Sequence, residues 1–367
     1  AIAAQKLEQP VHHIEAKVSG NLMKNGMGVT VPGTGMKGLP IAAAVGALGG
    51  DPEGRLEVLK NLTDQQVAEA KKMLAEKRVT LEIAALPNIL YSEAKVFAAD
   101  GSWALAAIAD SHTNVIKISR NGEILFAAEK TSASQSTALE AADIFAAVKL
   151  QEIYDFATTI SLDEIAFIKE AAVLNHTLSQ AGLANEYGLH IGVTMQRQIK
   201  RGLLSNDLLA QIVARTTAAS DARMGGASLP AMTNSGSGNQ GIAATMPVVV
   251  MAEHLKATDE EFIRALMLSH LTAIYIHSKL PKLSAFCAVT TASMGSAAGM
   301  AWLLTKKYDV VAAAVTNMVS DITGMICDGA SNSCAMKVST SVTSAYKALL
   351  MAADNTKVEA TDGIVDN

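Results

Sequence analysis

The sequence contains three cysteines, two of which share one short polar segment. Cys327 and Cys334 lie in "CDGASNSCAMK", which ends at Lys337, and Cys287 lies upstream in "LSAFCAVTTASMGSAAG". The Cys-x6-Cys spacing matches neither a zinc knuckle nor the ferredoxin patterns. A cysteine is most often a small, buried apolar residue. Three thiolates could instead bind three irons of a [4Fe–4S] cluster and leave the fourth iron open as a Lewis acid.

Glycine-rich polar loops are the second candidate for chemistry. Four such loops cover residues 24–35, 220–241, 283–299 and 327–337. Loops at helix starts offer unpaired backbone N–H groups, which are natural anion sites. The richest loop is "TNSGSGNQG", whose candidate binding residues are Asn234, Ser235, Gly236, Ser237, Gly238, Asn239 and Gln240. The alternative is a long surface loop that only caps helices.

Among the histidines, His190 is the best candidate to be free for a substrate. It lies in "NEYGLHIG", which is typical of a loop, and the chain contains no HExxH motif. His270 and His277 could share one face of a helix that runs towards Cys287. The usual role of such residues is a hydrogen-bonded core or surface histidine.

The elements that must position these residues divide the chain in two. Up to about residue 130, alternating strand-like patterns dominate, and "RNGE" at 120–123 predicts a hairpin. From about residue 139 onwards, apolar residues recur with helical spacing. The helical stretches are 139–153, 162–183, 203–224, 259–280 and 313–326. We predict an α+β fold, with a small N-terminal α/β unit at residues 1–135 and a large, mainly α-helical, cluster-binding domain at residues 136–367.

Composition excludes some classes of function. The net charge is −5, no Lys/Arg cluster is present, and aromatic residues make up only 4% of the chain, so nucleic acid is not an expected partner. The most apolar windows, 38–50 and 241–255, contain Gly or Pro or soon meet charge, which predicts buried helices and no membrane span. An odd cysteine count rules out a complete disulfide framework and, with 16 Met, favours a reducing cytoplasm.

Four long stretches carry a resemblance to a known family. They cover residues 21–51, 202–242, 264–304 and 320–341, and include "SDARMGGASLPAMTNSGSGNQG", "LSAFCAVTTASMGSAAG" and "MICDGASNSCAMKVSTS". Over nearly the whole chain the sequence resembles the serine dehydratase alpha-like family, and most closely its bacterial L-cysteine desulfidase branch. Such proteins are cytoplasmic iron–sulfur lyases that use no pyridoxal phosphate. They eliminate the β-substituent of cysteine to give sulfide, ammonia and pyruvate, whereas related L-serine dehydratases eliminate water from serine.

The resemblance implies roles for particular residues. Cys287, Cys327 and Cys334 would hold a [4Fe–4S] cluster, whose open iron would take the carboxylate and leaving group of the substrate. The "TNSGSGNQG" loop, together with Lys24 and Asn25, would line the substrate pocket. The general base would be His190, Lys337 or a residue outside this sequence; the residues leave that choice open. The Gly-Cys-Thr-Glu-Pro motif of such proteins is absent here, and we expect it just before residue 1, with a further segment after residue 367.

Three functions therefore stay open at the level of sequence. The first is an iron–sulfur L-cysteine desulfidase, and the second is an L-serine dehydratase on the same scaffold. The third is a non-catalytic protein that captures a small amino acid with its polar loop. We expect a small amino-acid substrate, no membrane partner, and a homodimer formed through the apolar helices.

Overall fold

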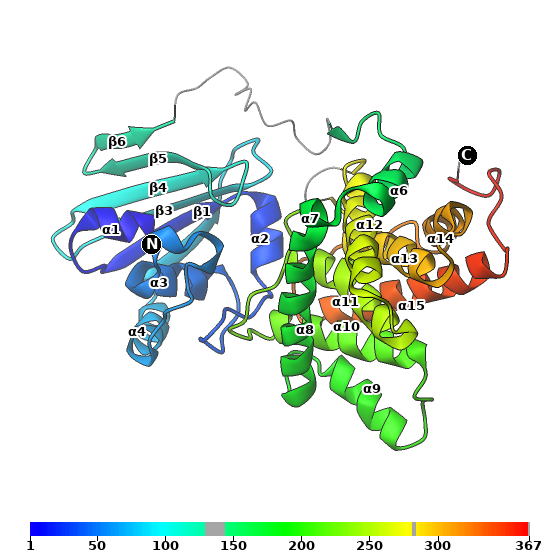
Figure 1. Cartoon of the computed structure of the whole chain (residues 1–367). Coiled ribbons are helices and arrows are strands. Elements are labelled where there is room, and N and C mark those ends of the chain that lie inside the picture. The colour runs from blue at the N-terminus through cyan, green and yellow to red at the C-terminus, as the bar shows by residue number, and fades with distance from the viewer. Residues whose placement is uncertain (129–143, 281–283, 366–367) are drawn as a thin grey trace. The chain divides into compact units, whose positions relative to one another are not determined.

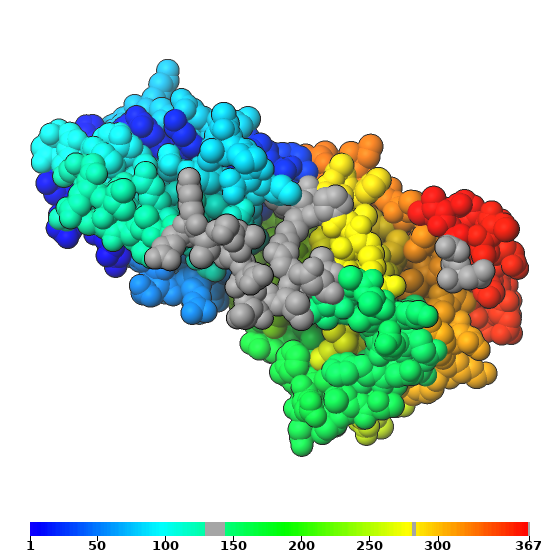
Figure 2. All heavy atoms as spheres, turned by 90° about the horizontal axis from the view of Figure 1, so that it is seen from above, coloured from blue at the N-terminus to red at the C-terminus, as the bar shows by residue number. Residues whose placement is uncertain are grey.

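The computed structural model describes residues 1–128, 144–280 and 284–365, and it divides the chain into two compact units (Figure 1). The first unit is Ala1–Ser136 with Asp328–Ser331, and the second is Thr137–Cys327 with Asn332–Asn367. The predicted α+β class is confirmed, because the first unit contains a sheet and the second is mainly helical. The predicted boundary between residues 135 and 136 lies outside the described residues. In Figure 2 the residues of the first unit's sheet and helices gather into one blue-to-cyan body.

The first unit consists of a sheet with small helices. Its elements are α1 (Ile2–Leu7), β1 (His13–Val18), α2 (Gly20–Gly26), α3 (Leu39–Gly49), the 3-10 helix η1 (Pro52–Glu57), α4 (Asp64–Ala75), β2 (Val79–Ile83), β3 (Tyr91–Phe97), β4 (Trp103–Ala109), β5 (Val115–Arg120) and β6 (Glu123–Ala127). The six strands of the described sheet run in the order β2-β1-β3-β4-β5-β6. The β1–β2 pair is parallel and the other neighbours are antiparallel.

Local signals in the sequence set two features of this unit. Asn121 and Gly122 both have positive φ, 49° and 92°, as a two-residue turn between β5 and β6 requires. The predicted hairpin is therefore confirmed. Thr63 and Gln66 form the predicted capping box at the start of α4. On one face of the sheet, α1 and α4 bury Ala3, Leu7 and Met73 against apolar side chains of β1, β3 and β4.

The second unit is a bundle of helices around α13. Its elements are α6 (Leu150–Thr159), α7 (Leu162–Ile165), the 3-10 helix η2 (Ala166–Ile168), α8 (Lys169–Ala184), α9 (Ile191–Lys200), α10 (Leu208–Met224), α11 (Gly238–Leu255), α12 (Asp259–His277), α13 (Val289–Thr305), α14 (Tyr308–Asp321) and α15 (Cys334–Ala353). Helix α13 packs against α11, α12, α14 and α15, and every residue from 289 to 303 is buried. It starts two residues after Cys287, so the most enclosed helix of the bundle fixes the position of that thiol.

Four predicted helices differ from the observed ones. Of the helix expected at 139–153, residues 145–149 are not helical and α6 starts only at Leu150, and the helix expected at 313–326 ends at Asp321. The helix expected at 203–224 starts only at Leu208, because the Asp207 side chain accepts a hydrogen bond from the backbone N–H of Ala210 (2.9 Å) and caps it. The helix expected at 162–183 is interrupted by η2, where a short 3-10 turn joins α7 to α8. Within the described residues, no helix is both long and apolar enough to cross a membrane.

Close packing between α8 and α10 depends on Gly182. A Cβ atom at this position would overlap the carbonyl oxygen of Ala218 on α10. We predict that Gly182→Ala lowers the free energy of unfolding by roughly 1–3 kcal/mol, because one of the two backbones must move. Gly20→Ala is the matched control, since nothing lies within 4 Å of its added Cβ. Equal urea midpoints for Gly182→Ala and the unsubstituted protein would contradict the packing described.

Candidate active site

Two backbone hydrogen bonds bring Cys287 and Cys327 together. The N–H of Cys287 donates to the carbonyl of Met325 (2.6 Å), and the N–H of Cys327 donates to the carbonyl of Ala285 (2.7 Å). These bonds flank an antiparallel bridge between residues 286 and 326. The chain before α13 and the chain after α14 are thereby joined at the two cysteines.

The third thiol and a lysine belong to the same cluster. Cys334 is the first residue of α15, and Lys337 follows one turn later. The pKa of Cys287 is raised to about 11, first by burial and then by the nearby Cys327 and Cys334, whereas the nearby Lys337 ammonium acts in the opposite direction. Three thiols and one cation therefore meet within electrostatic range of one another. None of the cysteines forms a disulfide.

The surroundings of the thiols leave polar atoms without partners. Thr290 Oγ1, in the first turn of α13, and Asn332 Oδ1, two residues before Cys334, are buried with no hydrogen-bond partner in the described residues. Such atoms are costly unless a bound group or water satisfies them. Soft thiolates with unsatisfied polar groups beside them suit an iron–sulfur cluster.

Single-ion sites are a different case. Among residues 1–128, 144–280 and 284–365, no three His, Cys, Asp or Glu side chains are grouped as ligands of one metal ion. A four-iron cube separates its thiolate ligands by the width of the cube, whereas one ion holds all of them at a single bond length. The two kinds of site therefore need different spacings of the same side chains.

The last turn of α10 connects the other polar elements of the site. Helix α10 packs against both α11 and α15. Ser220 Oγ donates to Asn239 Oδ1 (3.2 Å) in the first turn of α11, and the side chain of Arg223 fills the space that a Cβ atom at Gly238 would occupy. Negative charge on Cys334 raises the pKa of Arg223, against the larger lowering by burial. Arg223 thus lies between the polar loop and the cysteine cluster.

Arg223 was not singled out by sequence reasoning. The sequence does contain a pattern that points to this residue, because a positive charge in "SDARMGG" follows a long apolar helix and precedes the glycine-rich loop. Nothing in that pattern distinguishes it from a solvated arginine at a helix end, where cations are ordinarily favoured. Only the packing of α10 against α11 and α15 shows where it lies.

His190 is positioned by a buried carboxylate that sequence reasoning also missed. Asp221, which is 1% exposed, accepts a hydrogen bond from the backbone N–H of Gly192 (3.1 Å) at the start of α9. Burial raises the pKa of Asp221, whereas N–H groups of the 189–192 turn and the positive charge of His190 oppose the rise. His190 itself has φ of 56°, and its Nδ1 is buried without a hydrogen-bond partner in the described residues. The turn therefore holds the backbone of His190 in a strained, left-handed conformation, which fixes where its imidazole starts.

A buried network holds the start of the polar loop. His270 Nδ1 lies 3.1 Å from Asn234 Nδ2, and His270 Nε2 lies 2.9 Å from Thr245 Oγ1. Thr245 Oγ1 donates to the carbonyl of Gly241 (2.7 Å) and accepts from Asn175 Nδ2 (3.1 Å). This set of bonds requires His270 to be neutral, with its proton on Nε2. Burial accordingly lowers the pKa of His270 to about 4.

Lys24 and Asn25 lie in the first unit, at the end of α2. The segment Asp328–Ser331, between Cys327 and Cys334, belongs to the same unit. Gly28 forms a bridge with Ser331, and Gly329, with φ of 99°, packs against the backbone of Lys24. The chain next to Lys24 therefore contacts the linker between the two cysteines. Whether Lys24 and Asn25 bind substrate stays a prediction.

The second unit therefore brings together most of the residues predicted from sequence. The three cysteines and Lys337 form one cluster, the loop from Asn234 to Gln240 is linked to it through Arg223, and His190 is linked to the same helix through Asp221. His277 lies at the end of α12, and burial lowers its pKa.

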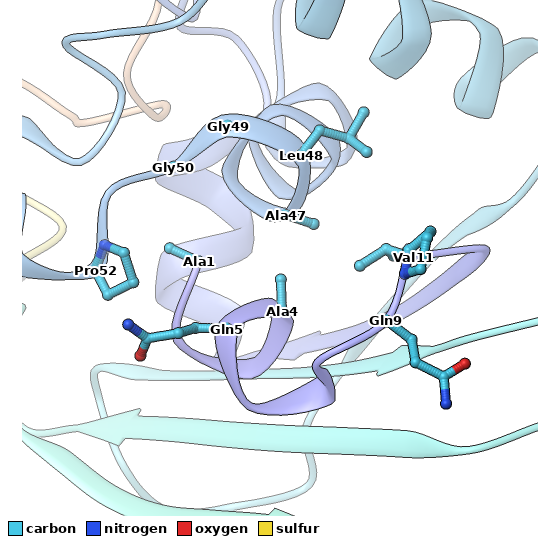
Figure 3. A pocket seen from close by; sticks show the side chains of 11 residues that line it. Ala1, Ala4, Gln5, Gln9, Val11, Ala47, Leu48, Gly49, Gly50 and Pro52 are labelled. Atoms are coloured by element: carbon cyan, nitrogen blue, oxygen red, sulfur yellow. The ribbon is translucent and has the colours of Figure 1, made fainter.

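The cavities found in each unit contain none of these residues. Figure 3 shows a cavity of about 380 Å³ in the first unit, between α1 and the end of α3. Gln5 and Gln9 are the polar side chains among its lining residues. A cavity of about 420 Å³ in the second unit lies beside His176 and Glu253, at the surface where α8, α11 and α12 meet. Neither lining includes a residue of the site described above.

Comparison with known proteins identifies the class. A sequence model of the family described as serine dehydratase alpha chain matches residues 53–367. The chain belongs to this family, which is a family of iron–sulfur-type lyases, and membership indicates a serine-dehydratase-like lyase. The resemblance to the serine dehydratase alpha-like family inferred from the sequence is thereby confirmed.

Similar bacterial proteins match the whole chain. A UPF0597 protein of Chromobacterium violaceum is 63% identical over 365 residues, covering 100% of this chain and 84% of that protein. The UPF0597 protein YE0448 of Yersinia enterocolitica is 60% identical over 365 residues, covering 100% of this chain and 83% of that protein. The UPF0597 protein YhaM of Shigella sonnei is 55% identical over 366 residues, covering 100% and 84%.

The three thiols should differ in reactivity when no metal is bound. Cys287 and Cys334 are buried, Cys327 is half-buried, and the pKa of Cys287 is raised to about 11. At pH 8 we expect iodoacetamide to modify Cys327 first, and Cys287 roughly 100-fold more slowly than an ordinary cysteine thiol. Peptide mass spectrometry over time measures this, with labelling in denaturant as the control. Equal rates at Cys287 and Cys327 in the folded protein would contradict the burial of Cys287 and its raised pKa.

His270 should make stability depend on pH. Its pKa of about 4 lies below the ordinary value of 6.5, so the unfolded chain binds the proton more readily than the folded protein. The free energy of unfolding should therefore fall as the pH drops below 6.5, by roughly 3 kcal/mol once pH 4 is reached. Urea unfolding at several pH values should give a flatter dependence for His270→Gln. His254→Gln, at an exposed position, should keep the pH dependence of the free energy of unfolding seen in the unsubstituted protein. The same pH dependence in His270→Gln would refute the network.

Proposed function

We propose that this protein is an iron–sulfur-dependent carbon–sulfur lyase that converts L-cysteine to pyruvate, ammonia and hydrogen sulfide. The observation that carries the proposal is the meeting of Cys287, Cys327 and Cys334 beside two cationic side chains, Lys337 and Arg223. Membership in the serine dehydratase alpha chain family supports a β-elimination. The preference for cysteine as the substrate rests on the resemblance of the sequence motifs to the desulfidase branch.

The residues present fit a [4Fe–4S] cluster with three protein ligands. Cys287, Cys327 and Cys334 would each supply one thiolate. When bound, such a cluster would supply a Lewis-acidic iron that can take a substrate carboxylate or leaving group. Lys337 and Arg223 offset the negative charge that three thiolates place in a half-buried site, where an uncompensated charge would be costly. We propose that no pyridoxal phosphate takes part.

The reaction requires one proton transfer and one bond cleavage. A base removes the proton from Cα, the electron pair left there forms a Cα–Cβ double bond, and the Cβ–S bond breaks with its electron pair going to sulfur. The products are hydrosulfide and aminoacrylate, which tautomerises to an imine. Water then hydrolyses the imine to pyruvate and ammonia without further catalysis.

His190 is the residue that we propose as the base. Its backbone is fixed by the Asp221-capped turn, and its Nδ1 is enclosed, so Nε2 is the ring nitrogen that would accept the α-proton. The Asp221 carboxylate lies close enough to His190 for the two groups to interact electrostatically. Lys337, beside the thiols, is better placed to offset their charge than to act as a base.

L-Serine dehydration is the second candidate on the same scaffold. The description of the family names serine dehydratase, and serine differs from cysteine only in the leaving group. The carboxylate, the α-amino group and the α-proton would meet the same residues. The relative rates on the two amino acids are therefore the quantity that separates the two functions.

The proposal is tested with full-length protein reconstituted without oxygen. We expect pyruvate and sulfide from L-cysteine, with a smaller specificity constant for L-serine. Cys327→Ala and Cys334→Ala should each lower the rate at least about 100-fold and reduce bound iron, because one ligand is lost. The matched control is Thr343→Ala, an exposed position on α15 whose hydroxyl donates to the carbonyl of Ser339 in the same helix. Full activity in Cys334→Ala, or activity without iron, would reject the proposal.

A further inference from the structure

Arg223 is a half-buried cation to which residues 1–128, 144–280 and 284–365 supply no carboxylate. In the described parts of the chain its guanidinium donates one hydrogen bond, to Met224 Sδ (3.0 Å), and forms no ion pair. By contrast, Arg215 on the same helix donates from Nη2 to Glu253 Oε1 (2.9 Å) and pairs with Glu253 through Nη1 as well. A guanidinium carries five N–H donors and is costly to remove from water without an anion. Arg223 therefore has donors left over for a negatively charged ligand.

The groups next to Arg223 are also donors. Its side chain lies against Gly238, the first residue of the 18-residue helix α11, whose N-terminus carries partial positive charge. Gln240, in the same turn, is 2% exposed, and its Nε2 is buried without a hydrogen-bond partner in the described residues. Asn239 Oδ1 accepts a hydrogen bond from Ser220, which leaves the Nδ2 group of Asn239 as its donor. An anion bound here would therefore be stabilised by three groups at once. They are the Arg223 guanidinium, the N-terminus of α11 and the unpartnered amide of Gln240.

We propose that Arg223 and the first turn of α11 bind the carboxylate of the substrate, and so select an amino acid over the corresponding amine. The planar guanidinium matches a carboxylate in two-point geometry, whereas a single thiolate uses only part of it. A carboxylate has about four lone-pair positions, so it can accept from Arg223 and still contact a second electrophile. The identification of this carboxylate with that of cysteine rests on the proposed function.

The test compares two thiols that differ in the carboxylate. Full-length reconstituted protein is titrated by calorimetry with 3-mercaptopropionate, which has the carboxylate, and with cysteamine, which lacks it. We expect Arg223→Gln to lower the affinity for 3-mercaptopropionate on the order of 100-fold, and the affinity for cysteamine less than about 3-fold. Arg223→Lys should lower the affinity for 3-mercaptopropionate by an intermediate amount, because lysine keeps the positive charge but cannot form the two parallel hydrogen bonds of a guanidinium. Arg215→Gln, on the same helix, should leave both affinities unchanged.

Other outcomes would overturn the inference. An equal loss for both ligands, no loss for either, or unsubstituted protein that binds neither would each show that Arg223 holds no carboxylate. A fall in iron content with an unchanged ratio of affinities would show that Arg223 serves only as a counter-charge for the thiolates and holds no carboxylate. Pyruvate and sulfide are measured on the same samples. If carboxylate binding depends on Arg223 but no pyruvate forms, the inference holds and the proposed lyase function fails.

Discussion

The site depends on the two backbone hydrogen bonds that join the chain around Cys287 to the chain around Cys327. Each bond is worth only about 1 kcal/mol net, but both lie at the edge of a buried helix whose position is fixed on all sides. They turn two cysteines that are distant in sequence into neighbours. Cys334 then completes the set, because its helix α15 packs against α13. Without these bonds the thiols would have no common geometry for a ligand to use.

Charge explains the arrangement around the thiols. Burial and mutual repulsion raise the pKa of Cys287, so deprotonating all three thiols together requires positive charge nearby. Lys337 supplies it from the first turn of α15, and Arg223 supplies it from the last turn of α10. The same turn of α10 holds the polar loop through Ser220 and the His190 turn through Asp221. The C-terminal end of α10 therefore contacts the metal-binding, substrate-binding and proton-transfer elements of the proposed mechanism.

Local chemistry made part of the fold predictable. Asn121–Gly122 and the Thr63–Gln66 pair act over a few residues, so the hairpin and the capped helix could be predicted from sequence. The start of α10 was predicted wrongly, because apolar spacing continues upstream of the Asp207 cap. Spacing alone did not distinguish the cysteines from core residues, and only the family resemblance did. Asp221 and Arg223 were missed, because their roles come from packing between helices and leave no pattern along the chain.

The most direct test of the central claim is the Mössbauer spectrum of full-length, oxygen-free protein reconstituted with ⁵⁷Fe, before and after L-cysteine is added. Three protein thiolates on a four-iron cluster predict one iron site that differs from the other three, and only that site should shift when the amino acid binds. Four equivalent irons, a spectrum unchanged by L-cysteine, or no retained iron would contradict the assignment of Cys287, Cys327 and Cys334 as the ligands of a cluster with one open iron.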